Sequence, residues 1–136
     1  MGTVRSERAQ GLLEFALVLP VLLIILSGLL DLGRLFYAYV AVTDAAGEGA
    51  NYASIYPDDE ANILARAQDA SGGLVVIDPD LVTIEAPSVQ SGAPVTVTVE
   101  YPFTLWTPFL NAIVPDGTLT LRAAATGVIL TGSWSN

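Results

Sequence analysis

The charged side chains near the N-terminus are the ones whose type and spacing could do chemistry. Glu14 stands at the start of an otherwise uncharged apolar run, residues 15–30, and Arg5 and Arg8 precede it. A carboxylate at the edge of hydrocarbon costs on the order of a few kcal/mol unless it is paired or held at the interface. Glu14 could therefore pair with one of the two arginines, lie at headgroup level, or meet an α-amino group created by cleavage just upstream.

The remaining polar residues do not indicate an enzyme. The sequence has no histidine and no cysteine, which removes the commonest general base, the nitrogen and sulfur metal ligands and the thiol nucleophiles. Catalysis would need carboxylates alone, and these are scattered, with no recognisable nucleotide-binding or hydrolase motif. Five acids could offer oxygen atoms to calcium but lack the spacing of a calcium loop, so a helix start and a turn explain them: Asp58, Asp59, Glu60, Asp78 and Asp80. The sequence predicts no catalytic residue, no cofactor and no metal site.

The apolar run predicts a membrane-spanning helix. As a helix it is about 24 Å long, short of a hydrocarbon core of about 30 Å, and leucines and aromatic residues on both sides can extend the span to about residues 12–36. The 52% hydrophobic content and the positive mean hydropathy agree. Asp31 and Arg34 could pair at the far interface, where Tyr37 and Tyr39 suit an aromatic belt. A removed secretory signal would be shorter and followed promptly by a small-residue cleavage site.

Charge predicts the orientation of the chain. Arg5 and Arg8 precede the span, so the N-terminus is expected in the cytoplasm and the C-terminal part is expected to be exported. Residues 42–136 hold 11 acids and 2 arginines, a net charge of −9. Such a surface repels nucleic acid and anionic headgroups. Without cysteine the exported part has no disulfides and depends on its core and on its neighbours.

Beyond the span, the helical pattern continues through an alanine-rich stretch. Gly47 and Gly49 are costly inside a helix, so we expect them to allow close packing against a sheet or a second helix. Pro57 is expected to end this helix, and the acids that follow it supply an N-cap and a first turn for a short helix to about Ala70. Pro20, inside the span, predicts either a static kink or a place that can melt locally.

The rest of the chain predicts a small antiparallel sheet. β-Branched residues indicate a strand at about 74–77, and alternation of apolar and polar residues indicates strands at about 81–86 and 95–99. Alternation resumes at 118–122 and leads to the apolar residues 128–130, which predicts a final strand or a strand pair. Three prolines in residues 101–117 indicate a long packed connection there, with one helical turn near 109–114. Its aromatic residues could form an exposed adhesive patch, but a core position is favoured: Phe103, Trp106 and Phe109. The sum is an α+β fold in which a long N-terminal helix packs on a small antiparallel sheet.

Four segments carry a family resemblance: ERAQGLLEFALVLPVLL, DAAGEGANYAS, PVTVTVEYPF and GTLTLRAAATGVIL. Together they resemble the TadE-like pilins of Tad (tight adherence) type IV pilus systems, over nearly the whole chain. The leader in that family usually ends in Gly, followed by four residues and then Glu with an aromatic residue. Counting back from Glu14 and Phe15 places the cut between Ala9 and Gln10, so Ala9 stands where the family has Gly.

The resemblance implies roles for residues and partners. Ala9 and Gln10 would flank the prepilin peptidase cut, Glu14 would compensate the new amino terminus, Phe15 would begin the apolar assembly segment, and Pro20 would permit local melting during packing. The implied partners are other copies of the chain or related pilins, a prepilin peptidase, a secretion ATPase, inner-membrane platform proteins and the membrane itself, with no nucleic acid.

The predicted division is a leader at 1–9, a long helix at 10–56 and an exported α+β domain at 57–136. The expected function is a structural subunit or minor pilin of a Tad-type filament that supports adhesion, in a single-pass membrane protein. Two alternatives stay open: a membrane-anchored assembly or scaffold factor that is never polymerised, and a tethered acidic domain that recruits a basic partner.

Overall fold

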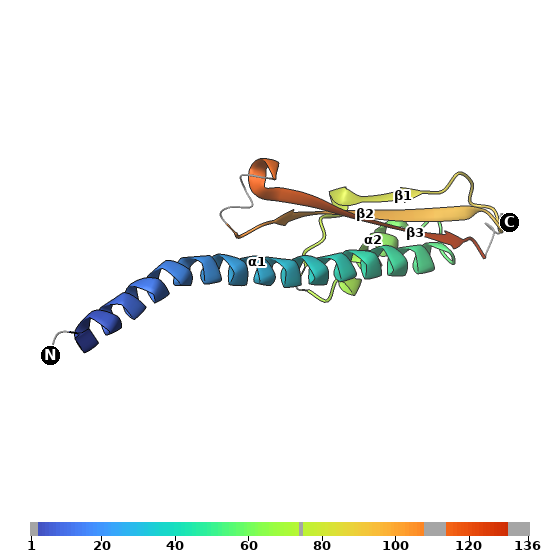
Figure 1. Ribbon diagram of the computed structural model, residues 1–136. Helices are drawn as coiled ribbons and strands as arrows, with labels where there is room; N and C mark the ends of the chain where they lie inside the picture. The colour runs from blue at the N-terminus through green and yellow to red at the C-terminus, as the bar shows by residue number, and fades with distance from the viewer. Residues whose placement is uncertain (1–2, 74, 108–113, 131–136) are drawn as a thin grey trace.

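The computed structural model describes residues 3–73, 75–107 and 114–130, and its backbone is a long helix beside a small sheet. The elements are α1 (Thr3–Ala53), α2 (Glu60–Ala70), β1 (Val82–Glu85), β2 (Pro94–Thr104) and β3 (Thr118–Val128), with short 3-10 turns at Pro79–Leu81 and Pro115–Gly117. The two helices lie on one face of the sheet, and the N-terminal half of α1 projects beyond it (Figure 1). The predicted α+β arrangement is confirmed.

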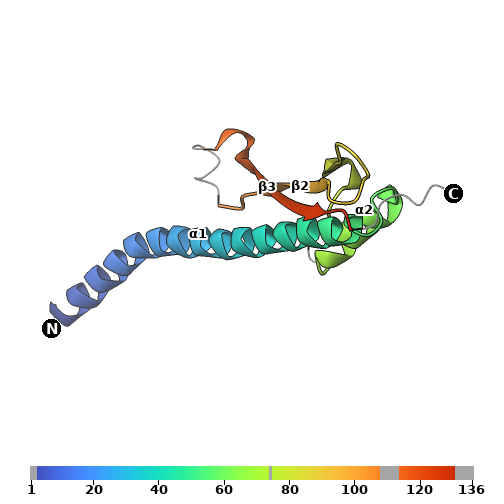
Figure 2. The same cartoon turned by 90° about the vertical axis from the view of Figure 1, so that its right-hand side faces the viewer.

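α1 has two halves with different surroundings. Residues 9–26 are all exposed, whereas one face of the segment from Ala38 to Ala53 is buried against the domain. The helix runs without interruption through Pro20, and its N-terminal part curves away from the axis of the rest in both views (Figures 1 and 2). α1 ends at Ala53, a few residues before Pro57, because the chain tightens there: the Ile55 N–H donates to the carbonyl of Tyr52.

The sheet has three antiparallel strands in the order β1-β2-β3. β3 pairs with β2 along its whole length, from Pro94↔Val128 to Thr104↔Thr118, whereas β1 reaches only Thr96 to Val99 of β2. The predicted strand at 95–99 is therefore part of a longer one, and the prediction that residues 101–104 belong to a connection is wrong. Beyond Val99 the β1 side of β2 is a free edge, and a free edge tolerates a proline such as Pro102.

One other prediction about the strands needs correction. No strand forms at 75–77, where Val75 and Ile77 fill the core and Asp78 caps the following 3-10 turn. Of the two alternatives for the last part of the sheet, the structure has the single strand: β3 runs from Thr118 to Val128. The helical turn expected near residues 109–114 and the side chain of Phe109 lie outside the described residues.

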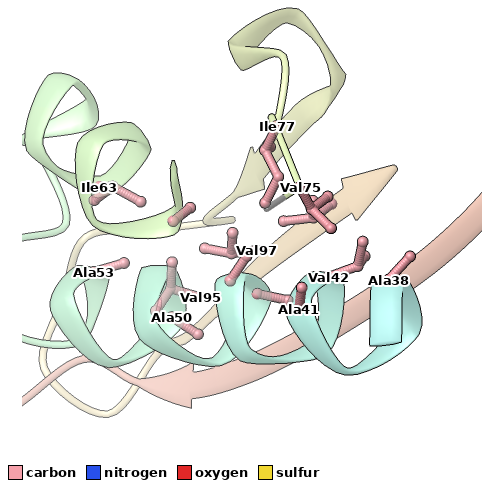
Figure 3. Packing of buried hydrophobic residues seen from close by; sticks show 14 of the residues in the cluster. Ala38, Ala41, Val42, Ala50, Ala53, Ile63, Val75, Ile77, Val95 and Val97 are labelled. Atoms are coloured by element: carbon pink, nitrogen blue, oxygen red, sulfur yellow. The ribbon is translucent and has the colours of Figure 1, made fainter. Parts of the chain in front are cut away.

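The core lies between the inner face of β2 and the alanines of α1. In this cluster Val95 and Val97 of β2 lie over the middle of the buried face of α1, Ile63 of α2 lies near Ala53, and Val75 lies near Val42 (Figure 3). Small side chains let the helix approach the sheet closely. At Gly49 an added Cβ would lie 3.0 Å from Val97 Cγ1, so the predicted close packing is confirmed there. At Gly47 an added Cβ would meet nothing within 4 Å, so the same prediction is wrong for Gly47.

A second close approach fastens the far end of the domain. A Cβ on Gly127 of β3 would collide with the Ser54 hydroxyl and would lie 3.0 Å from the carbonyl oxygen of Ala50. Just beyond this contact, the Leu130 N–H donates to the Ser54 carbonyl over 2.8 Å. The end of β3 is thus held against the C-terminal end of α1.

Candidate functional site

Residues 9–26 of α1, which we call the bare segment, carry the residues to which the family resemblance assigns a role. Ala9, Gln10, Glu14, Phe15 and Pro20 all lie on the exposed segment, away from the sheet. The helix is long and apolar enough to cross a membrane, and none of the residues in its most apolar stretch of 18 is buried. At about 1.5 Å per residue, residues 9–26 span about 27 Å. This segment is thus suited to hydrocarbon or to other helices, not to water.

Glu14 lies one helical turn after Gln10. The side-chain amide of Gln10 donates to Glu14 Oε1 over 3.2 Å. The Ala9-Gln10 bond lies inside α1, which begins at Thr3. An amino terminus created at Gln10 would therefore begin the helix one turn from the Glu14 carboxylate.

The joint between α1 and the domain is built on Asp31. This carboxylate is 3% exposed, and its Oδ2 accepts hydrogen bonds from the N–H of Trp106 at 2.9 Å, the N–H of Thr107 at 2.8 Å and the Thr107 hydroxyl at 2.7 Å. Its Oδ1 accepts from Arg34 Nη1 at 3.0 Å, which confirms the predicted ion pair. The Thr107 hydroxyl also lies 3.1 Å from that of Ser27. The end of β2 is thereby tied to α1 where the bare segment stops.

Arg34 extends this joint onto two aromatic rings. Its guanidinium carbon lies 3.9 Å from the ring centroid of Trp106 and 5.1 Å from that of Phe103. Phe103 is buried, as predicted, but Trp106 is 73% exposed, so the prediction that Trp106 belongs to the core is wrong. Its ring covers Arg34 instead. The Trp106 indole and the Arg34 guanidinium thus stack just beyond the bare segment of α1. Aromatic and basic side chains are favoured at such a position when it lies at the surface of a membrane.

The acids proposed as helix and turn caps take those positions. Asp59 caps α2, accepting from the backbone N–H of Asn62 at 3.4 Å and from its side-chain amide at 2.7 Å, and the Tyr52 hydroxyl donates to it at 3.2 Å. The Asn62 side-chain hydrogen bond is the main cause that lowers the pKa of Asp59 below its ordinary value. Burial, together with the hydrogen bond to Asp59, raises the pKa of Tyr52. Within the described ranges, no group of three or more acids is placed to hold a metal ion.

A hollow of about 750 Å³ lies between α1 and α2. Asp44 and Glu48 of α1 and Arg66 and Asp69 of α2 line it. It is an open, polar depression with both signs of charge, and the described structure places neither a nucleophile next to a base nor a shielded carboxylate pair there. A chemical step has no evident site in it.

Comparison with known protein families bears on the long helix. The family model described as TadE-like protein matches residues 9–51, which are the bare segment and most of the half that packs on the sheet. No curated protein and no solved structure matches the chain. The predicted resemblance is therefore confirmed for this helix, because residues 9–51 match the model of the TadE-like family.

Proposed function

We propose that the chain is a pilin-like subunit, major or minor, of a Tad-type filament, and that it has no enzymatic activity. The observation that carries the proposal is that one continuous helix has two parts. Its bare segment is apolar and exposed, and its C-terminal part packs in the folded domain. An apolar surface of this length must be covered either by lipid or by other helices. A subunit that is first anchored in a bilayer and later packed in a filament meets both needs with the same residues.

In the anchored state, residues 9–26 cross the hydrocarbon with the N-terminus in the cytoplasm. The domain contacts α1 from Ser27 onward, so on that side the membrane ends near the Asp31 joint rather than at residue 36. Trp106, Tyr37 and Tyr39 then lie at headgroup level, where aromatic residues are favoured. The acidic domain stands outside, repelled by anionic headgroups.

In the assembled state, a prepilin peptidase has cut between Ala9 and Gln10. Glu14 compensates the charge of the new amino terminus, and the segment from Phe15 packs among other helices. A secretion ATPase and inner-membrane platform proteins are the partners that this route requires, as the resemblance implies. The two alternatives, a permanent scaffold anchor and a tethered acidic binding domain, keep the uncut N-terminus and never enter a filament.

The first experiment measures the intact mass of the native protein from membranes and from sheared surface material. We expect a chain that starts at Gln10 and is present in the sheared fraction. A chain that retains Arg5 and Arg8 and occurs in membranes alone would overturn the proposal in favour of the anchor.

Glu14→Gln provides a second test that leaves the fold intact, because Glu14 is exposed and remote from the domain. The chain should stay at normal levels in the membrane while its amount in sheared filaments falls by about tenfold or more, since a carboxylate in hydrocarbon is retained only when it is used. Glu48→Gln, an exposed carboxylate on the domain half of the same helix, is the matched control and should assemble normally. Equal assembly of both variants would contradict a role for Glu14.

A further inference from the structure

A hollow of about 480 Å³ lies on one side of α1, just beyond the bare segment. β1 pairs with β2 only from Thr96 to Val99, so the β1 side of β2 is open where the hollow lies. Tyr101 and Phe103 of β2 form the wall toward the sheet. The facing wall includes four residues of α1: Leu29, Leu30, Gly33 and Tyr37. The hollow is thus shared between the helix and the domain.

The hollow has room for a hydrocarbon chain next to the bare segment. Leu29 and Leu30 are each 64% exposed, and a Cβ added at Gly33 would meet nothing within 4 Å. Hollows that hold small molecules have volumes of about 300 to 1,000 Å³, and this one lies in that range. In the anchored state proposed above, Leu29 and Leu30 lie where the acyl chains of the bilayer end. Lipids are the molecules that surround an apolar hollow at that level.

Three residues that line the hollow can donate hydrogen bonds to a phosphate group. Arg34 uses its Nη1 to bind Asp31, and within the described part of the chain its other guanidinium nitrogens have no hydrogen-bond partner. The hydroxyls of Tyr37 and Tyr101 likewise make no hydrogen bond to any described residue. A guanidinium has five N–H donors in a planar fork that matches a phosphate, so the ion pair with Asp31 leaves donors for a second anion.

Along α1, the apolar and polar residues of the hollow follow the order of the parts of a phospholipid. Leu29 and Leu30 come first, Arg34 lies about one helical turn further, and Tyr37 lies nearly a turn beyond Arg34. From the hydrocarbon outward, a phospholipid presents its acyl chains, then its ester groups and its phosphate. Arg34 is also the only basic residue between residues 9 and 65. A phosphate at this level therefore has one positive side chain to pair with, and that side chain lines the hollow.

We propose that the hollow binds one phospholipid molecule. An acyl chain lies against Leu29 and Gly33, and the phosphate accepts hydrogen bonds from Arg34 and from the hydroxyls of Tyr37 and Tyr101. The lipid occupies the side of the Asp31 joint that β1 leaves open, and it contacts helix and domain at once. This inference rests on the anchored state of the proposed function and adds a ligand that the filament role does not require.

Native mass spectrometry of the full-length chain, purified from membranes in mild detergent, measures the fraction that carries one lipid. We expect a one-lipid species for the wild type and a several-fold smaller fraction for Gly33→Leu, because the leucine side chain occupies the hollow. Leucine is a better helix former than glycine, so this variant keeps the helix. Gly28→Leu is the matched control. A Cβ there also meets nothing within 4 Å, but Gly28 does not line the hollow, so its lipid-bound fraction should equal that of the wild type.

A second comparison tests the phosphate. The chain is freed of lipid and mixed with phosphatidylethanolamine or with diacylglycerol of the same acyl chains, which has no phosphate. Phosphatidylethanolamine has no net charge, so the acidic domain does not repel it. The wild type should bind the phospholipid several-fold better. Tyr37→Phe should reduce this preference, whereas Tyr39→Phe should keep it, because Tyr39 lines a groove with Leu121 on the other side of the helix.

Each contrary result has a distinct meaning. Equal lipid-bound fractions for Gly33→Leu and Gly28→Leu would overturn the site, because the lipid would then lie elsewhere on α1. Equal binding of the two lipids by the wild type would overturn the assignment of a phospholipid. A wild-type chain that occurs in membranes but carries no lipid would contradict the site and leave the anchored state standing. A chain absent from the membrane fraction would contradict the anchored state, and the lipid site with it.

Discussion

Asp31 decides how the domain is joined to the helix. Among the described residues, Asp31 is the one buried acid. Its carboxylate accepts hydrogen bonds from Arg34, Trp106 and Thr107. Hydrogen bonds to a buried charge are worth more than neutral ones, and removing the charge leaves their donors without an adequate partner. The joint therefore depends on a single side chain at the point where the chain passes from the bare segment to the domain.

Asp31→Asn should weaken this joint selectively. The amide can keep one acceptor toward Thr107 but presents an NH₂ group or a neutral oxygen to Arg34, so we expect a loss of about 1 to 3 kcal/mol in the free energy of unfolding. Denaturant unfolding of the full chain in detergent measures it. Asp44→Asn, an exposed acid on the same helix, is the control and should stay within about 0.5 kcal/mol of the wild type. Equal behaviour of the two variants would contradict the role assigned to Asp31.

Asp59 gives the domain an acid-sensitive helix cap. Its pKa is lowered in the folded state, chiefly by the Asn62 side chain, so folding favours the ionised form. The contribution is present above the unfolded pKa of about 3.9 and is lost as the pH falls through the lower folded pKa. In Asp59→Asn the cap remains but does not titrate, so thermal unfolding between about pH 5 and pH 2 should show a shallower loss of stability. A wild-type slope in Asp59→Asn would contradict the role assigned to this cap.

At the scale of the element, α1 uses two nearby glycines in different ways. Gly49 faces Val97 with no room for a larger side chain, whereas Gly47 faces open space. Gly47→Ala should raise stability by about 0.5 to 1 kcal/mol, because alanine is the better helix former. Gly49→Leu should lower stability by about 1 to 3 kcal/mol through overpacking. Chemical denaturation of the two variants measures both effects, and a gain in stability for Gly49→Leu would contradict the close packing.

The elements can be predicted from the sequence where a local signal fixes them. The acids that follow Pro57 predict an N-cap and a short helix to about Ala70; Asp59 provides the cap and α2 ends at Ala70, so both predictions are confirmed. The pattern predicts β2 too short because Pro102 is typical of a strand breaker, and its tolerance depends on β1 being short. Val75 and Ile77 have the composition of a strand but fill the core without pairing. Strand pairing is a tertiary property that a local pattern does not contain.

The joint can be predicted from the sequence only in part. The spacing of Asp31 and Arg34 predicts their ion pair, but the further partners of Asp31 at Trp106 and Thr107 are about 75 residues away in the chain. The surrounding prolines favour a core position for Trp106, whereas Arg34 holds its ring at the surface.

At the scale of the whole molecule, the charge is divided as sharply as the apolar surface. Residues 42–136 carry −9, whereas residues 15–30 of α1 carry no charge. Association between copies must therefore overcome repulsion between domains, and salt should relieve it. Raising the salt concentration from about 10 mM to about 150 mM shortens the screening length from about 30 Å to about 8 Å.

We expect self-association of the full chain in detergent to strengthen over this range of salt, as measured by sedimentation. Binding to a basic partner would respond in the opposite sense, because salt weakens attraction between unlike charges. In a membrane extract, a main complex that salt strengthens would therefore indicate a self-assembling subunit. A main complex that salt weakens would indicate a tethered acidic domain bound to a basic partner. Weakening of the self-complex by salt would contradict repulsion between the acidic domains as the force that limits self-association.

The domain is fastened to α1 at both of its ends. Asp31 holds the end of β2 near the membrane, and Ser54 holds the end of β3 through Leu130 and the close contact at Gly127. A pull along the helix would load these two attachments together, in shear, instead of opening one after the other as in peeling. Tension on the bare segment would therefore pass into the sheet through both attachments, and the domain would move together with the helix.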